Sequence, residues 1–144
     1  APVGRGAVAE VGRASVEREG GDVTIVATML MVHRAMQAAS LLEDEGIDAE
    51  VIDLRWIRPM DLDTVTASVE KTGRLVVAEE QWHDAGWGAA LISRLARSGA
   101  SMSTAPRVVG LPDDMLIPYA PPLEDAVIPT PEAIADEVRA SLYS

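Results

Sequence analysis

The chain has 144 residues, of which 48% are hydrophobic and 24% charged, so it is long and apolar enough for one folded domain with a real core and is not a disordered chain. It carries 12 Lys and Arg against 23 Asp and Glu, and the formal charge of −11 argues against a nucleic acid or an anionic membrane as its partner. Cysteine is absent, which excludes disulfides and cysteine-bound zinc, and without a membrane-length apolar run or a signal segment we expect a cytoplasmic protein.

The first residues predict a lead-in segment followed by an edge strand. Residues 1–12 are rich in glycine and alanine, so the domain itself is placed at residues 13–144. Residues 14–19 alternate like a strand and end at Gly20-Gly21. Because only a short turn joins this strand to the next, we expect it to run antiparallel to the others, at an edge of the sheet.

An apolar strand followed by a helix then occurs three times, before a short last strand. Continuous apolar runs are typical of strands buried on both faces of a parallel sheet, and apolar residues at helical spacing follow each of the first three. Each helix is followed by a glycine suited to a left-handed cap. This alternation predicts βαβ units with right-handed crossovers. The strands are expected at 23–27, 49–54, 74–79 and 107–110, and the helices at 32–42, 62–69 and 89–97.

The last third of the chain is rich in proline. Seven of the nine prolines lie between Pro106 and Pro131, so we expect this stretch to be neither sheet interior nor helix, but an extended segment wrapped over the domain. At residues 130–132 a threonine, a proline and a glutamate have the order of a helix start. The apolar face of this final helix consists of Ile134, Val138 and Leu142.

Three loops that follow predicted strands should meet at one edge of the sheet, where α/β domains bind ligands and partners. They are residues 28–31, 55–60 and 80–87, and they hold all three tryptophans and His83. Tryptophan and arginine are enriched at the centres of protein interfaces, so an interface is one interpretation. Ordinary packing of these side chains over the sheet edge is the other.

The motifs of self-contained active sites are missing from the sequence. The first parallel strand leads into no glycine-rich phosphate loop, there is no nucleophile elbow, and neither histidine stands in a metal-binding frame. Glu79 and Glu80 are neighbours on a strand, so they face opposite sides and cannot act as a pair, and one of them is expected to be buried. The residues alone therefore predict an acidic α/β domain with a tryptophan-bearing loop edge and no active site of its own.

Two stretches carry a resemblance to a known family. One is Asp53-Leu54-Arg55 with Pro59 and Asp61, and the other runs from Ser68-Val69 through Lys71-Thr72 and Leu75 to Glu79-Glu80. Together with the sequence around them, they resemble the C-terminal domain of transketolase-type thiamine diphosphate enzymes. The nearest type is the beta subunit of the decarboxylating component of 2-oxo acid dehydrogenase complexes. Residues 117–120, 123–125 and 128–129 resemble the pyruvate or acetoin type more than the branched-chain type.

The resemblance implies a three-layer α/β/α fold with a five-stranded, mostly parallel sheet whose first strand is antiparallel. It implies that thiamine diphosphate and magnesium are held elsewhere in the complete enzyme, because the family motifs that bind them are not in this sequence. The chain is then expected to hold no catalytic, cofactor-binding or metal-binding residue and to be inactive alone. The implied partners are an alpha subunit, a second beta subunit and the dihydrolipoyl acyltransferase core.

Within the family, this domain joins subunits and contacts the acyltransferase. Thr104 stands two positions before the proline that opens the last strand, where the family often has an acidic residue that contacts the acyltransferase. Either the seven acidic residues after Leu111 replace that charge, or docking differs. The residues predicted to form the interface are Trp56, Arg58, Trp82, His83, Trp87, Thr104, Glu124 and Asp125.

The expected function is therefore assembly and docking within a complex that decarboxylates a pyruvate-like 2-oxo acid oxidatively and transfers the acyl group to lipoyl groups. Two alternatives stay open at this point. The chain could be the C-terminal domain of a transketolase or deoxyxylulose-phosphate synthase. It could also be a stand-alone regulatory module that binds a small molecule.

Overall fold

A computed structural model describes residues 9–112, 114–118, 120–124 and 126–143. The strands are β1 (Ser15–Arg18), β2 (Val23–Ala27), β3 (Ala49–Asp53), β4 (Leu75–Trp82) and β5 (Arg107–Leu111). The helices are α1 (Leu30–Glu43), α2 (Leu62–Thr72), α3 (Trp87–Ser98), α4 (Pro121–Glu124) and α5 (Pro131–Leu142).

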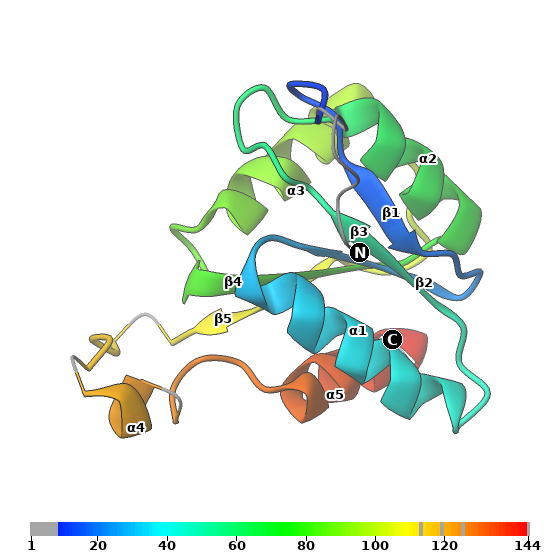
Figure 1. Cartoon of the computed structure of the whole chain (residues 1–144). Coiled ribbons are helices and arrows are strands. Elements are labelled where there is room, and N and C mark those ends of the chain that lie inside the picture. Colours follow the sequence, from blue (N-terminus) through cyan, green and yellow to red (C-terminus); the bar gives the residue numbers. More distant parts are fainter. Residues whose placement is uncertain (1–8, 113, 119, 125, 144) are drawn as a thin grey trace.

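The five strands form one sheet between two layers of helices (Figure 1). The strand order is β1-β3-β2-β4-β5, and the strands from β2 to β5 are parallel. Helices α1 and α5 pack together on one face of the sheet, and α2 and α3 pack on the other. The three-layer α/β/α prediction with an antiparallel first strand is therefore confirmed.

Strand β1 has the predicted direction and edge position, although its neighbour is not the strand that follows it in the chain. It pairs antiparallel with β3, with Ser15 opposite Asp53. Every residue of β2 is buried, and β3 and β4 occupy its two sides, so the partly exposed β1 is left with the outer side of β3. Gly20 makes this path possible, because a Cβ atom there would lie 2.3 Å from the backbone of Ala49 and Glu50.

The helix ends follow the capping signals of the sequence. Asp61 accepts a hydrogen bond of 3.1 Å from the backbone N–H of Thr64 at the start of α2, and Gly73 ends that helix in a left-handed conformation. Thr130 accepts a bond of 3.2 Å from the N–H of Ala133 at the start of α5. Helix α3 starts at Trp87, two residues earlier than predicted.

An apolar core lies on each side of the sheet. On the α1 and α5 side it contains Ile25, Met31, Leu42 and Ile134, and on the α2 and α3 side it contains Ile52, Leu75, Trp87, Leu91 and Leu95. Each large side chain buried in this way stabilises the fold by roughly 1.5–3 kcal/mol. The rigid sheet that results holds the loops at its carboxyl edge.

The proline-rich segment differs from its prediction in two respects. The part around α4 projects away from the sheet (Figure 1), and only the end, where Ile128 is buried in the core, lies over the domain; the segment also contains the short helix α4. Prolines are compatible with a first helical turn, because the backbone N–H groups there have no partner within the helix. Near its end, Arg34 on α1 donates hydrogen bonds to the carbonyl oxygens of Ile128 (3.0 Å) and Pro129 (2.6 Å).

Candidate interaction surface at the carboxyl edge

The parallel strands bring four connections together at the carboxyl edge of the sheet, those that follow β2, β3, β4 and β5. Large apolar side chains are exposed in these connections, most of all Met29 (81%) and Leu116 (82%). We call this set the carboxyl-edge surface: Met29, Leu30, Ile57, Trp82, Leu116, Ile117 and Leu123. Exposed large apolar side chains make this edge a candidate surface for a protein partner.

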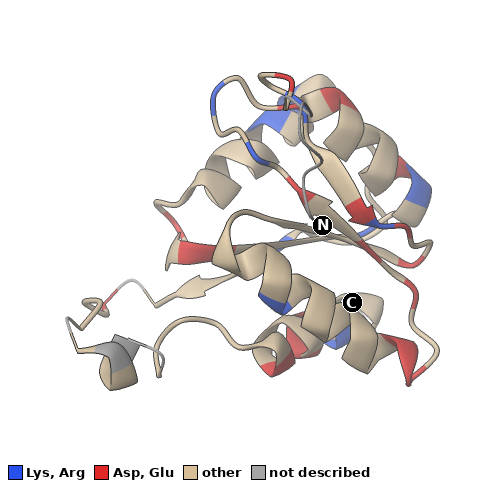
Figure 2. Cartoon of the chain, in the orientation of Figure 1, with Lys and Arg blue, Asp and Glu red and all other residues tan. Residues whose placement is uncertain are grey.

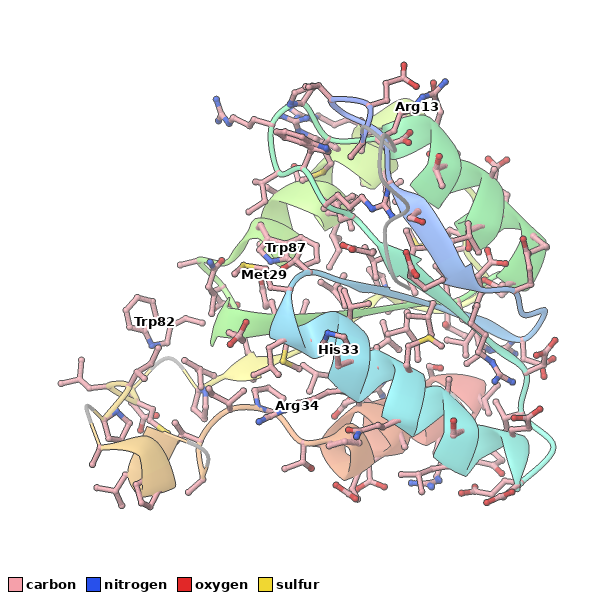
Figure 3. The ribbon with its side chains drawn as sticks, in the orientation of Figure 1. Arg13, Met29, His33, Arg34, Trp82 and Trp87 are labelled. Atoms are coloured by element: carbon pink, nitrogen blue, oxygen red, sulfur yellow. The ribbon has the colours of Figure 1, made fainter. Side chains whose placement is uncertain are left out.

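Trp82 connects the end of β4 with the segment after β5. It is the last residue of β4, and 40% of it is exposed. Its indole N–H donates a hydrogen bond of 2.8 Å to the carbonyl oxygen of Met115. The bond holds the projecting segment after β5 against the end of β4, where Figure 3 shows the tryptophan beside that segment.

The other two tryptophans have different environments. Trp87 is only 6% exposed and packs in the core on the α2 and α3 side, so within this chain it fits the alternative of ordinary packing. Trp56 is half-buried in the loop after β3, where it lines a hollow together with Met29. Trp82 is therefore the most exposed of the three tryptophans.

Arg58 and His83 lie in loops at this edge, and both are exposed. His83 is held in place on β5: its backbone N–H donates to Leu111 (3.2 Å), and its ring Nε2 lies 3.0 Å from the carbonyl oxygen of Gly110. Arg58 precedes Pro59 in the loop after β3, and the peptide bond between the two is cis.

Thr104 lies at the opposite edge of the sheet. It precedes β5, which runs parallel to β4, so it is near the amino end of β5 whereas Trp82 ends β4. The Thr104 hydroxyl is buried and has no hydrogen-bond partner among the residues that the structure describes. Glu124 ends α4, but its side chain lies outside the described part, as does Asp125 altogether. The structure therefore does not bring Thr104 together with the tryptophans.

The acidic character of the C-terminal third is visible on α5. Figure 2 shows acidic residues on α5 and at the end of α1. Part of this charge is neutralised within the chain, because Arg139 forms ion pairs with Glu45 and Asp136. The hydrogen bond from Arg139, followed by its charge, lowers the pKa of Glu45 against the opposing effect of burial.

Glu79 is the buried member of the glutamate pair, as expected, and it is fully inaccessible. One carboxylate oxygen accepts a hydrogen bond of 3.0 Å from the N–H of Gly88, and the other has no partner among the described residues. Burial raises the pKa of Glu79, opposed by the bond from Gly88 and by the charge of His83. Gly86 and Gly88 leave room for this carboxylate at the start of α3.

Sequence reasoning missed several residues of the carboxyl-edge surface. It weighed the tryptophans, whereas Met29 and Leu116 are more exposed than any of them. A usable signal was present, because Leu116, Ile117 and Leu123 are large apolar residues within a stretch that the prolines keep away from the core. Apolar residues with no predicted core contact are candidates for a partner's surface.

The residues in the described part do not fit thiamine diphosphate and magnesium. No group of three or more His, Asp or Glu side chains is placed there to hold a metal ion. The exposed Met29 side chain precedes α1 and stands where a phosphate would have to approach that helix. No thiamine-dependent step is therefore assigned to these residues.

No helix of the described part is both long enough and apolar enough to cross a membrane.

Taken together, the parallel sheet between two helix layers and the exposed apolar side chains at its carboxyl edge define a three-layer α/β domain. The family model for "Transketolase, C-terminal domain" matches residues 12–134. The chain therefore belongs to the family of transketolase C-terminal domains.

The curated relatives include beta subunits. The chain is 39% identical over 132 residues to the pyruvate dehydrogenase E1 component subunit beta of Rickettsia felis, covering 92% of this chain and 40% of the relative. It is 40% identical over 131 residues to the acetoin:2,6-dichlorophenolindophenol oxidoreductase subunit beta of Cupriavidus necator, covering 91% and 39%. The chain thus spans about two-fifths of the length of these relatives.

Solved structures agree on the fold. A chain of a split gene transketolase, described as an inactive beta4 tetramer, matches with a TM-score of 0.84 at 32% identity, over 98% of this chain and 46% of that one. A 2-oxoglutarate:ferredoxin oxidoreductase from Magnetococcus marinus matches with a TM-score of 0.59 at 16% identity, which shows a shared fold only.

Proposed function

We propose that the chain is the C-terminal assembly domain of a beta-type subunit of a 2-oxo acid dehydrogenase, and that the carboxyl-edge surface is buried against another part of that enzyme. The observation that carries the proposal is the exposure of Met29, Trp82 and Leu116 at the loop edge of a sheet whose two faces are already covered. The beta-subunit names of relatives at about 40% identity support it.

In this proposal the complete enzyme decarboxylates a pyruvate-like 2-oxo acid with thiamine diphosphate and magnesium, and the acyl group passes to lipoyl groups of an acyltransferase core. An alpha subunit and a second beta subunit complete the enzyme. This chain supplies contacts and no reacting group, so it is inactive alone. A cytoplasmic location is part of the same proposal.

Assembly tests the proposal directly. The chain is co-expressed with an alpha subunit and the amino-terminal part of a beta subunit, and the complex is measured by sedimentation velocity. Truncating a central interface residue typically costs about 2–4 kcal/mol, and 1.4 kcal/mol is a tenfold change in affinity. We therefore expect Trp82→Ala combined with Leu116→Ala to weaken the complex at least tenfold.

The matched control is Tyr143→Ala, which removes a 90% exposed aromatic side chain that does not belong to the carboxyl-edge surface. This control should leave assembly unchanged. Equal assembly by the double variant and the unmodified chain would remove the support for the proposal.

A transketolase is the second candidate, because a split gene transketolase chain matches almost the whole of this chain. The two candidates differ in the substrate of the reconstituted enzyme. Reduction of a dye with pyruvate or acetoin supports the dehydrogenase, whereas transfer of a two-carbon unit between sugar phosphates supports the transketolase.

A further inference from the structure

A hollow of about 330 Å³ opens at the carboxyl edge between the turn after β2 and the loop after β3. Small-molecule sites in proteins usually measure roughly 300–1,000 Å³, so this one suits a single compact molecule and is too small for a dinucleotide. Its wall combines apolar and polar side chains. The lining residues are Ala9, Thr28, Met29, Asp53, Arg55 and Trp56.

Two of these residues have an uncommon backbone conformation. Met29 has a φ of 51° and Arg55 a φ of 57°, and no other non-glycine residue of the described part has a positive φ. Strained conformations of this kind persist where the surrounding structure enforces them, and they cluster at binding sites. Here both occur in the wall of the same hollow.

The charges around the hollow determine which ligands it accepts. The Arg55 guanidinium lies 3.8 Å from the Asp53 carboxylate and 3.4 Å from that of Glu17, so two acids surround one base. This group carries a net negative charge, which disfavours an anion. One oxygen of Asp53 already accepts a bond of 3.0 Å from the Arg55 N–H. A carboxylate has about four acceptor sites, so Asp53 can still accept from a ligand.

The turn before α1 excludes a phosphate as well. Met29 occupies the position that precedes the first helical residue and is 81% exposed, in the place where phosphate-binding folds have a glycine-rich loop. Figure 3 shows its side chain at this end of α1. Trp56 and Met29 supply apolar walls against which a planar ring can pack.

We propose that this hollow binds a small uncharged or cationic ring compound with hydroxyl or amino donors, of the nucleoside type, with its ring between Trp56 and Met29 and its donors on Asp53 and Thr28. Because Met29 lines this hollow and also belongs to the carboxyl-edge surface, a ligand here would compete with the assembly proposed above, and the test below therefore uses the chain alone.

Adenosine and AMP form a matched pair of probes, since they differ only in the phosphate. Each is titrated into the 144-residue chain labelled with ¹⁵N, and the amide and indole signals are followed by NMR. We expect saturable shifts with adenosine at the Thr28, Met29 and Arg55 amides and the Trp56 indole. Binding of AMP should be at least tenfold weaker because of the local negative charge.

Asp53→Asn tests the polar contact while it keeps an oxygen that can accept the Arg55 N–H. This variant should have an at least fivefold lower affinity for adenosine. Asp63→Asn removes the same charge from an exposed position beside a different hollow, and it should bind adenosine like the unmodified chain. Thr28→Val is a second variant in case Asp53→Asn fails to fold. Three results would overturn the proposal: no saturable shift with adenosine, equal affinity for AMP, or shifts that map elsewhere.

Discussion

Glu79 on β4 caps helix α3 from the sheet, because its carboxylate accepts a hydrogen bond of 3.0 Å from the Gly88 N–H. The position before this helix is Gly86, which has no side chain to do so. Two strand residues further on, the Gln81 side chain accepts a weaker bond of 3.3 Å from the Trp87 N–H. The sheet therefore supplies the hydrogen-bond acceptor that caps the start of α3, a role that a serine or aspartate next to the helix usually has.

The first prediction concerns the pH dependence of Glu79. Burial raises the pKa of Glu79 in the folded chain, so its contribution to stability is fully present below the unfolded pKa of about 4.3 and is lost as the pH rises through the folded pKa. Glu79→Gln keeps an acceptor for Gly88 but cannot ionise. We expect the free energy of unfolding of the unmodified chain, relative to this variant, to decrease between pH 4.5 and 7.5.

Urea unfolding of both proteins at several pH values measures this difference. The comparison cancels the contribution of other acids, which titrate in both chains. A difference that is constant with pH, or that increases with it, would contradict the prediction.

The second prediction concerns the glycine beside that carboxylate. A Cβ atom on Gly86 would lie 2.2–2.3 Å from the Glu79 carboxylate, although the backbone of Gly86 has an ordinary negative φ of −77°. Gly86→Ala should therefore destabilise the chain by about 2 kcal/mol through steric overlap alone. Glu79→Ala combined with Gly86→Ala should recover part of the loss, and a double-mutant cycle by thermal unfolding would measure the coupling.

Gly46→Ala is the matched control, since Gly46 has open space around its Cβ position and a left-handed φ of 79°. The stability that Gly46→Ala loses should come from its backbone conformation only. This loss should therefore be the same whether residue 79 is glutamate or alanine. Purely additive effects for Gly86 and Glu79 would show that the two do not touch.

The third prediction concerns Lys71, the single lysine of the chain, which forms an ion pair with the buried Glu50. Burial of Glu50 opposes its ionisation, but bonds from Lys71, Ser68 and Gly20 outweigh it and lower the pKa of Glu50. The resulting stability is present above the unfolded pKa and is lost as the pH falls through the folded pKa. Lys71→Gln should therefore lower the free energy of unfolding by about 1–3 kcal/mol at pH 7, a range that allows for the partial exposure of Lys71. At pH 3 the decrease should be smaller.

Chemical unfolding at the two pH values tests this expectation, with Lys71→Arg as the variant that keeps the charge. An equal loss at pH 3 and pH 7 would mean that packing of the lysine stem, and not its charge, is responsible.

The fourth prediction concerns the segment after β5. Trp82→Phe keeps an aromatic ring but removes the indole N–H that donates to Met115. We expect faster cleavage by a nonspecific protease within residues 114–124, because this segment loses one of its attachments. The free energy of unfolding should change by less than about 1 kcal/mol. Unchanged cleavage would show that other contacts hold this segment. Tyr143→Phe, at an exposed position outside it, is the control.

The sequence by itself determined the class of fold and most of its elements. Apolar runs such as 23–27, capping residues such as Asp61 and Thr130, and terminal glycines such as Gly73 act over a few residues, so their effects can be deduced locally. Family motifs also pointed to the correct domain, which the match over residues 12–134 confirms.

Only the tertiary structure decided how distant parts of the chain meet. Pairing of β1 with β3 depends on β2 already having two neighbours, and the capping of α3 by Glu79 depends on the sheet placing that carboxylate at the helix start. Exposure is also a tertiary property: Trp87 and Trp82 lie five positions apart, yet one is in the core and the other is open. Local sequence cannot settle these outcomes, because burial and strand order depend on every element that competes for the same surface.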